Sequence, residues 1–218
     1  MTRAVIFDLD GTLIDSAPDI HAAANRVMAG HGLAPFTLAE ARGFIGHGAG
    51  VLIQRCLAAR GVADRAGLKT QALQDFLEIY EHAFDLTAPY PDVVAVLEQL
   101  ADMDLALGIC TNKPAGPAAA VLRHLDLARF FTVVIGGDSL PMRKPDPAPL
   151  LAAITALGAT ATVYVGDSEV DAETAQRAGV PFALFTEGYR KSPVESLPHN
   201  VAFAAFSDLP DAVRGILG

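Results

Sequence analysis

The chain has 218 residues, of which 51% are hydrophobic and 19% charged, a length that suits one sizeable core or a core with a small second domain. Its 16 basic and 25 acidic residues give a net charge of −9, which argues against a nucleic-acid partner held through phosphates and against an anionic membrane surface. No uninterrupted apolar stretch reaches the roughly 18 residues of a membrane span, and no signal region precedes the first acidic residue, so we expect a cytoplasmic protein.

The first predicted element is a strand at residues 4–7, and two aspartates follow it directly. Asp8 and Asp10 stand in the sequence DLDGT, and in an extended segment side chains two residues apart point to the same side. Like charges this close raise the free energy of ionising each other. Other groups of the chain, or a bound cation, must therefore offset the repulsion.

Residues 17–87 show helical spacing and no convincing strand. The pattern is clearest where apolar residues recur at Leu73, Phe76, Leu77, Tyr80 and Phe84. So long a stretch is far beyond a normal loop between two strands. We therefore predict a helical cap domain at 17–87, inserted into a catalytic core domain that takes residues 1–16 and 88–218.

Strands and helices alternate along the rest of the chain. Short apolar runs rich in β-branched residues predict strands at 105–110, 132–135, 162–165 and 181–185. Helical spacing predicts helices at 91–103, 114–125, 148–157 and 170–178. The fold class is therefore α/β, with a Rossmann-like doubly wound parallel sheet and an inserted helical cap.

Polar residues follow several predicted strands at the carboxyl edge of the sheet, where ligands of such sheets bind. They are Asp8, Asp10 and Thr12 after the first strand, Thr111, Asn112 and Lys113 after the second, Lys144 beyond the third, and Asp167, Ser168, Glu169 and Asp171 after the fourth. Asp8 and Asp167 offer oxygen ligands that suit Mg²⁺, and Lys144 adds a positive charge. This combination allows Asp8 to act as a nucleophile on phosphorus.

The neighbouring residues fit the remaining roles in phosphoryl transfer. Asp10 is placed to protonate the leaving oxygen and then to accept a proton from the attacking water. Thr111 and Asn112 are able to donate hydrogen bonds to the phosphoryl oxygens, or to cap the following helix. Asp171 fits either a metal site or the start of a helix.

Several other residues are expected at the surface or in the packed interior, without a role in the site. We expect Lys113, Arg143 and Glu169 to be exposed. The two cysteines, Cys56 and Cys110, lack CxxC spacing and are expected to pack in the interior of a protein from a reducing compartment.

The motifs DLDGT, TN, KPDP and GDSEVD occur in this order and span the α/β part of the chain. Together they resemble the signature motifs of the phosphatase branch of the haloacid-dehalogenase superfamily. The resemblance implies a covalent aspartyl-phosphate on Asp8, acid–base catalysis by Asp10, and Mg²⁺ held by Asp8, Asp167 and the backbone carbonyl of Asp10. The other residues that it implicates are Thr111 and Lys144 as phosphate contacts and Asp171 as a supporting acid.

Longer stretches narrow the resemblance. VVIGGD, KPDPAPLL, VGDSEVDAETAQRAG, TEGY and the cap stretch GFIGHGAGVLIQRCL look like those of bacterial phosphoglycolate phosphatases. This implies hydrolysis of 2-phosphoglycolate to glycolate and phosphate. A sugar phosphate, a nucleotide or pyrophosphate stays open as an alternative substrate, because the cap loops set substrate choice.

Four cap residues are candidates for substrate binding. Gly46 and Gly48 flank His47 and permit close backbone approach to a ligand. Arg42 is the nearest cation of the cap and is able to pair with a small carboxylate. The plainer interpretations are an exposed loop histidine and a helix-surface arginine.

Several rival functions are less consistent with the residues. Asp10 favours a phosphatase over a dehalogenase, which has no need of a second acid. The cap's lysine, Lys69, stands too late for a phosphonoacetaldehyde hydrolase, and Ile20 occupies the position where mutases resembling β-phosphoglucomutase carry a histidine. A receiver-like phosphoryl acceptor places its aspartate after a middle strand. We therefore expect an enzyme whose partner is a small phosphate monoester. The expected oligomeric state is a monomer or a homodimer.

Overall fold

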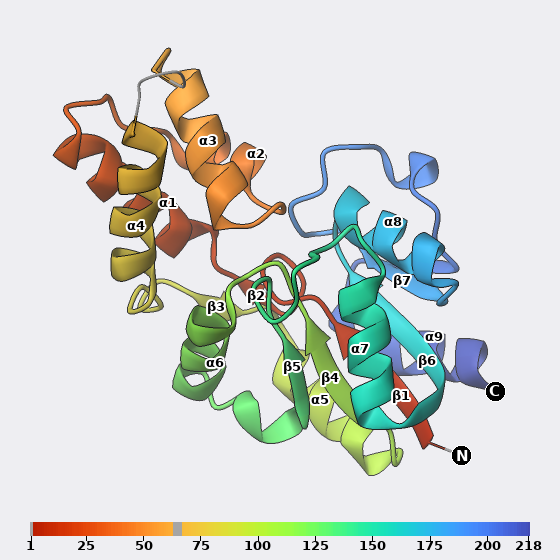
Figure 1. Ribbon diagram of the computed structural model, residues 1–218. Helices are drawn as coiled ribbons and strands as arrows, with labels where there is room; N and C mark the ends of the chain where they lie inside the picture. The colour runs from red at the N-terminus through yellow and green to blue at the C-terminus, as the bar shows by residue number, and fades with distance from the viewer. Residues whose placement is uncertain (1, 63–66) are drawn as a thin grey trace.

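Within residues 2–62 and 67–218, which the computed structural model describes, six strands form one parallel sheet in the order β5-β4-β1-β6-β7-β8 (Figure 1). Its strands are β1 (Thr2–Phe7), β4 (Ala106–Cys110), β5 (Val133–Ile135), β6 (Ala159–Gly166), β7 (Phe182–Phe185) and β8 (Val201–Phe203). The predicted α/β fold class is confirmed. The sequence prediction lacks β8, a strand of three residues at the edge of the sheet.

The central strand β1 explains why the first apolar run is unbroken. It pairs with β4 on one side and with β6 on the other. Its alternate side chains enter two different hydrophobic clusters, Val5 and Phe7 on one face of the sheet and Ile6 on the opposite face. A strand buried on both faces needs an apolar residue at every position.

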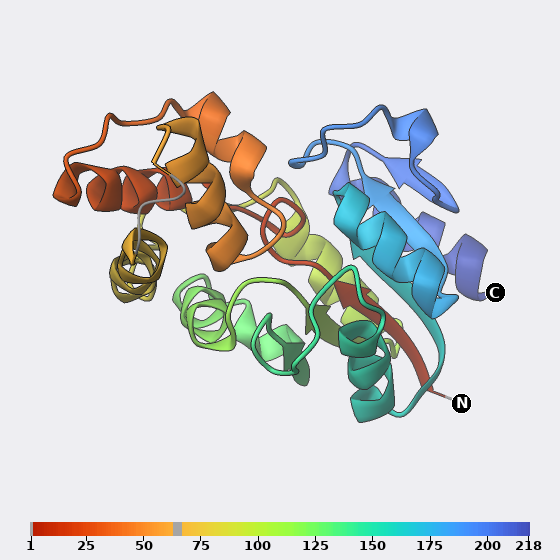
Figure 2. The ribbon, with the colours of Figure 1, turned by 45° about the horizontal axis from the view of Figure 1, so that its top comes forward.

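Helices cover both faces of the sheet. The face of Val5 is covered by α5 (Val93–Asp102), α6 (Ala115–His124) and α9 (Leu209–Leu217). The face of Ile6 is covered by α7 (Ala148–Leu157) and α8 (Glu169–Ala178), which lie in front of the sheet in Figures 1 and 2. Three short 3-10 helices complete the elements, η1 (Ala128–Phe130), η2 (Val194–Ser196) and η3 (Phe206–Asp208).

The helices of the predicted cap lie to one side of the sheet (Figure 1). They are α1 (Ala17–Gly30), α2 (Leu38–Phe44), α3 (Ala49–Ala59) and α4 (Leu68–Tyr80). They share a hydrophobic cluster, to which α1 contributes Ile20 and α4 contributes Phe76, and which Tyr189 from the last part of the chain joins. The division of the chain into a core domain, 1–16 and 88–218, and a cap domain, 17–87, stays a prediction.

A two-stranded antiparallel sheet connects the helices to the parallel sheet. Strand β2 (Ile14–Asp15) pairs with β3 (Ala88–Pro89), so that Asp15 lies opposite Ala88. The buried carboxylate of Asp19, in the first turn of α1, accepts hydrogen bonds from the backbone N–H of Leu86 at 3.0 Å and the hydroxyl of Thr87 at 2.6 Å. These hydrogen bonds connect the two segments beside the strand pair.

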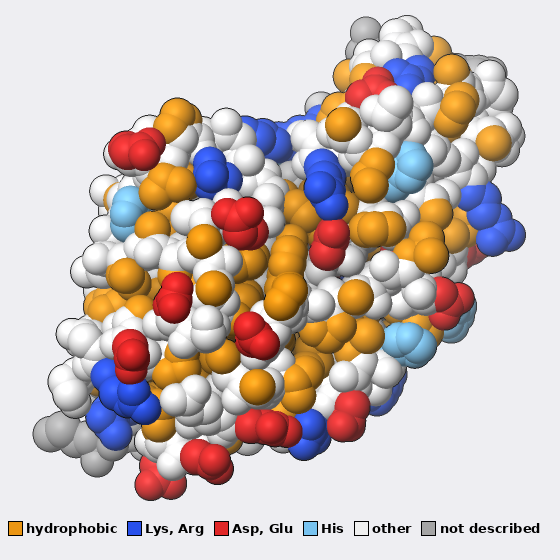
Figure 3. All heavy atoms as spheres, turned by 180° about the vertical axis from the view of Figure 1, so that it is seen from behind, with side chains coloured by type: hydrophobic (Ala, Val, Ile, Leu, Met, Phe, Trp, Pro, Cys, Tyr) orange, Lys and Arg blue, Asp and Glu red, His pale blue; other side chains and the backbone are white. Residues whose placement is uncertain are grey.

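The surface agrees with the mixed composition. On the face shown in Figure 3, acidic and basic side chains are interspersed among hydrophobic ones. None of the helices in the described part of the chain combines the length and apolar character needed to cross a bilayer.

Candidate active site

The carboxyl ends of three adjacent strands bring the predicted residues together. Asp8 follows β1, Thr111 follows β4 and Asp167 follows β6, and all three side chains are buried. The strand ladder continues one residue further at two of these ends: the N–H of Asp8 donates to the carbonyl of Val165, and that of Thr111 to the carbonyl of Ile135. The backbone therefore holds both residues at fixed positions.

Three buried carboxylates form the centre of the site. One oxygen each of Asp8, Asp167 and Asp171 lies within 4.8 Å of the others. Asp167 accepts hydrogen bonds from the hydroxyl of Thr12 at 2.8 Å and from the N–H of Tyr189 at 2.6 Å. Burial and the neighbouring carboxylates nevertheless raise the pKa of Asp167 well above its usual range. Such a cluster of hard oxygen donors suits a divalent cation.

Lys144 is the buried counter-charge of this cluster. Its ammonium lies 2.7 Å from Asp171 Oδ1 and 2.9 Å from Asp8 Oδ1, and it donates to the hydroxyl of Tyr164 at 2.8 Å. Burial lowers the pKa of Lys144, but the two carboxylates raise it by more, so the ammonium stays charged. Burial also raises the pKa of Asp8 to about 6, although Lys144 acts in the opposite direction.

Asp8 faces Lys144 with one of its two carboxylate oxygens. Its Oδ1 is buried and makes no hydrogen bond within the described residues, although Lys144 lies beside it.

Of the two roles that the sequence leaves open for Asp171, the structure shows the start of a helix, together with an ion pair to Lys144. Its Oδ1 binds Lys144, and its Oδ2 accepts from the N–H and hydroxyl of Ser168 in a capping box at the start of α8. Because burial is outweighed by Lys144 and these hydrogen bonds, the pKa of Asp171 is lowered. Asp171 therefore fixes Lys144 in place while it starts the helix.

Asp10 has partners that the sequence did not indicate. The hydroxyl of Ser16 donates to its Oδ1 at 2.5 Å, and the ammonium of Lys113 donates to the same oxygen at 3.1 Å. Lys113 also donates to the hydroxyl of Tyr80, the last residue of α4. The expectation that Lys113 is exposed was wrong: its side chain is 3% exposed, because the cap tyrosine covers it and Asp10 balances its charge.

Asn112 is predicted to donate to the phosphoryl oxygens, and in the structure its side-chain amide has partners within the protein. Its amide nitrogen donates to the backbone carbonyls of Gly46 at 3.2 Å and Lys144 at 3.0 Å. Asn112 therefore holds a cap loop and the lysine loop together, which leaves Thr111 as the candidate donor from the TN pair.

Two small cavities lie beside Asp8, between the sheet edge and the cap. The first has a volume of about 50 Å³, and its apolar walls come from the cap. Its lining residues are Asp8, Asp10, Ile20, Ile45, Gly46, Gly48, Ala49, Leu52, Tyr80, Thr111, Asn112, Lys113 and Pro114. The second, of about 20 Å³, includes His47, Asp167, Glu169 and Lys191 in its lining.

The structure brings three of the four cap candidates to these cavities. Gly46 lines both, Gly48 the first and His47 the second. Burial, with the charge of Arg55, lowers the pKa of His47, so its ring is neutral at pH 7. Arg42 lines neither cavity; its guanidinium donates to Asp15 at 2.9 Å.

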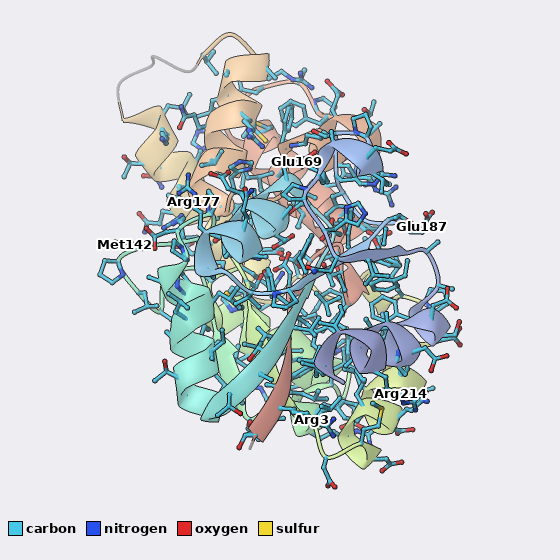
Figure 4. All side chains as sticks on the ribbon, turned by 90° about the vertical axis from the view of Figure 1, so that its right-hand side faces the viewer. Arg3, Met142, Glu169, Arg177, Glu187 and Arg214 are labelled. Carbon is cyan, nitrogen blue, oxygen red and sulfur yellow. The ribbon has the colours of Figure 1, made fainter. Side chains whose placement is uncertain are left out.

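Two further residues of the site come from the last part of the chain. Glu169, at the end of α8 nearest the cap in Figure 4, is half-buried instead of exposed, because it accepts from the N–H groups of Lys191 and Ser192. Tyr189 holds Asp167 through its N–H and Asp15 through its hydroxyl. Its position after the end of β7, in TEGY, is the signal that could have placed it at this edge of the sheet.

The two cysteines take no part in the site. Cys56 and Cys110 are buried and unbonded to each other, as expected for packing residues. Burial raises the pKa of the Cys56 thiol to about 11 and that of Cys110 to about 12, so neither is a thiolate at neutral pH.

The site is therefore equipped for reaction with an anionic electrophile. It has a buried carboxylate at the end of the central strand, a second carboxyl group nearby, a charged lysine and a cluster of hard oxygen ligands. The comparisons with known proteins agree with this chemistry. The profile of the haloacid dehalogenase-like hydrolases matches residues 5–185 of the chain.

Relatives over almost the full length are phosphatases. The phosphoglycolate phosphatase of Cereibacter sphaeroides (strain ATCC 17029) is 53% identical, with 98% of each chain covered, and that of Rhodospirillum rubrum is 44% identical, with 97% of this chain and 90% of the relative covered. The crystal structure of a predicted phosphoglycolate phosphatase from Haemophilus somnus 129pt superimposes with a TM-score of 0.91 at 28% identity and covers 97% of each chain.

Proposed function

The chain belongs to the haloacid dehalogenase-like hydrolase family and is a phosphoric monoester hydrolase, and from this premise we propose that its substrate is 2-phosphoglycolate. The relatives named above supply the substrate by similarity. The observation of this chain that carries the proposal is the size of the cavity beside Asp8. Its volume of about 50 Å³ is far below the roughly 300 Å³ at which ordinary ligand pockets begin, which favours a two-carbon leaving group over a sugar or a nucleoside.

The donor set supports Mg²⁺ as the cofactor. Asp8 and Asp167, with the backbone carbonyl of Asp10, would hold the ion. The close grouping of the buried carboxylate oxygens, and the raised pKa values of Asp8 and Asp167, fit a cation between them. When bound, Mg²⁺ would offset the negative charge and polarise the phosphoryl group. Asp171 is already occupied by Lys144 and Ser168, which supports a role beside the metal site instead of in it.

The residues of the chain then divide the reaction between them. A carboxylate oxygen of Asp8 forms a bond to phosphorus, and the bond from phosphorus to the glycolate oxygen breaks. Asp10 gives its proton to the departing oxygen. In the second step Asp10 takes a proton from water, whose oxygen displaces phosphate from Asp8. Lys144 and the Thr111 hydroxyl stabilise the phosphoryl oxygens throughout.

Metal binding has a readout that does not depend on activity. Burial raises the pKa of Asp8 from 3.8 to about 6 in the metal-free protein, so its folded state binds more protons than the unfolded chain between these values. The contribution of Asp8 to the free energy of unfolding therefore falls as the pH rises from about 4 to about 6. A cation bound between the ionised carboxylates restores this contribution to stability.

We expect Mg²⁺ to raise the Tm by about 5 °C or more at a hundredfold excess over its Kd, and by more at pH 8 than at pH 5. Calorimetry with NaCl at matched ionic strength measures the difference, and Asp167→Asn is the control variant that should lose it. An equal shift in that variant, or none in the parent, contradicts the ligand assignment.

A competition assay tests the substrate. We expect kcat/KM for 2-phosphoglycolate to exceed the values for glucose 6-phosphate, AMP and pyrophosphate by at least about tenfold, because the small cavity does not accept the larger leaving groups. Faster hydrolysis of any of the three would replace phosphoglycolate as the proposed substrate. Many turnovers per chain would also exclude a receiver-like acceptor, which takes up one phosphoryl group.

A further inference from the structure

A buried ammonium faces the space that a leaving group would occupy. Among the residues that line the first cavity, all of which the structure describes, Lys113 is the one cation. Its Nζ donates to Asp10 and to the hydroxyl of Tyr80. An ammonium has three N–H donors, so one remains beyond these two acceptors.

Tyr80 contributes a second donor at the same place. Because its oxygen accepts from Lys113, its own O–H is free to donate. The ring of Tyr80 lies 4.1 Å from the Lys113 ammonium and stacks on Phe76 with ring centroids 4.9 Å apart. Both contacts fix the hydroxyl beside the lysine.

The surroundings make these two donors selective. The cap contributes Ile20, Ile45, Ala49 and Leu52 to the same cavity, none of which can satisfy a charged group. An anion buried there without a partner would be strongly disfavoured, and one held by an ammonium and a hydroxyl would not. The cavity thus distinguishes a charged leaving group from a neutral one.

We infer that Lys113 and the Tyr80 hydroxyl bind the carboxylate of the leaving group, which makes Lys113 the residue that determines specificity for an acidic phosphate ester. This inference rests on the proposed function and deepens it, because it names the group of the substrate that the site recognises. Lys113 comes from the predicted core and Tyr80 from the predicted cap, so both groups bind the carboxylate only when core and cap are in contact.

Two substrates that differ at one group test the inference. 2-Phosphoglycolate and 2-hydroxyethyl phosphate share the phosphate, the bridging oxygen and the first carbon, but only the former carries a carboxylate. The measured quantity is the ratio of kcat/KM for the two esters. In the parent enzyme we expect the ratio to favour phosphoglycolate by about 10- to 100-fold.

Lys113→Met should bring this ratio close to one, mainly by raising KM for phosphoglycolate. Tyr80→Phe, which keeps the ring and its packing, should lower the ratio by about three- to tenfold. Lys69→Met is the matched control, since it removes an exposed cap lysine that donates to Gln54, and it should leave the ratio unchanged. If Lys113→Met turns over too slowly, or fails to fold, Tyr80→Phe and the Kd of both esters in an Asp8→Asn background provide the readout.

The outcomes separate the two proposals. A parent ratio near one overturns the carboxylate site and the phosphoglycolate assignment together. A high parent ratio that survives in Lys113→Met and Tyr80→Phe overturns the inference and leaves the proposed function standing. An equal loss of activity on both esters also overturns it, because Lys113 would then act only by positioning Asp10.

Discussion

Replacement of Asp8 by Asn is expected to lower kcat by roughly 10⁴-fold or more, the scale on which the loss of a covalent nucleophile is felt in other hydrolases. The amide is a poor nucleophile and carries no charge for the Lys144 ammonium 2.9 Å away or for a divalent cation. The change should not destabilise the protein. Because burial raises the pKa of Asp8, a neutral group at this position is expected to leave the Tm at pH 8 equal to or above that of the metal-free parent.

Steady-state turnover of 2-phosphoglycolate and circular dichroism of the same preparations measure both effects. Asp85→Asn is the control, since it makes the same change at an exposed residue outside the site. Mass spectrometry of rapidly quenched parent enzyme should locate a phosphoryl adduct on Asp8. Near-normal turnover in Asp8→Asn, or an adduct on another residue, would show that Asp8 is not the nucleophile.

The second large effect concerns Asp10. Asp10→Asn is expected to lower kcat for 2-phosphoglycolate by about 10²- to 10⁴-fold, the usual contribution of a general acid–base group. The amide keeps the size of the side chain and is still able to accept from Ser16 and Lys113, but it has no proton to exchange.

Substrates with different leaving groups distinguish the role of Asp10 as an acid from its role as a base. p-Nitrophenolate departs without protonation, so burst-phase kinetics with p-nitrophenyl phosphate should show a first step that is little changed and a second step that is slow. With 2-phosphoglycolate both steps should be slow. A single-turnover rate equal to that of the parent on 2-phosphoglycolate would remove the acid role from Asp10.

The α/β part of the fold could be predicted because its signals are local. Each central strand is buried on both faces, so an unbroken apolar run marks it, and the predicted helix 148–157 has the bounds that α7 has in the structure. Parallel strands place their carboxyl ends at one edge, which is why Asp8, Thr111 and Asp167 could be assembled from sequence. Strands β2 and β3 have two residues each, too few for such a pattern, and the edge strand β8 is missing from the prediction.

The partners across the two parts of the molecule could not be predicted. Lys113 is buried only because Tyr80 and Asp10, far away in the sequence, lie against it. Arg42 appeared available for a substrate carboxylate, yet Asp15 pairs with it. The sequence does not indicate which partner a charged side chain will have, because the same residue is stable either exposed to solvent or in an ion pair.

The antiparallel pair of Asp15 and Ala88 has a consequence for how such an enzyme can change over time. The chain enters the helices of the predicted cap after Asp15 and leaves them before Ala88. Because these two residues are paired, the helices are attached to the rest of the chain as a hairpin loop is attached to its two strands. An insert of another length or architecture could be exchanged there without displacing the backbone of Asp8. A change in this one segment can therefore alter the substrate, while the residues that break the bond to phosphorus are retained.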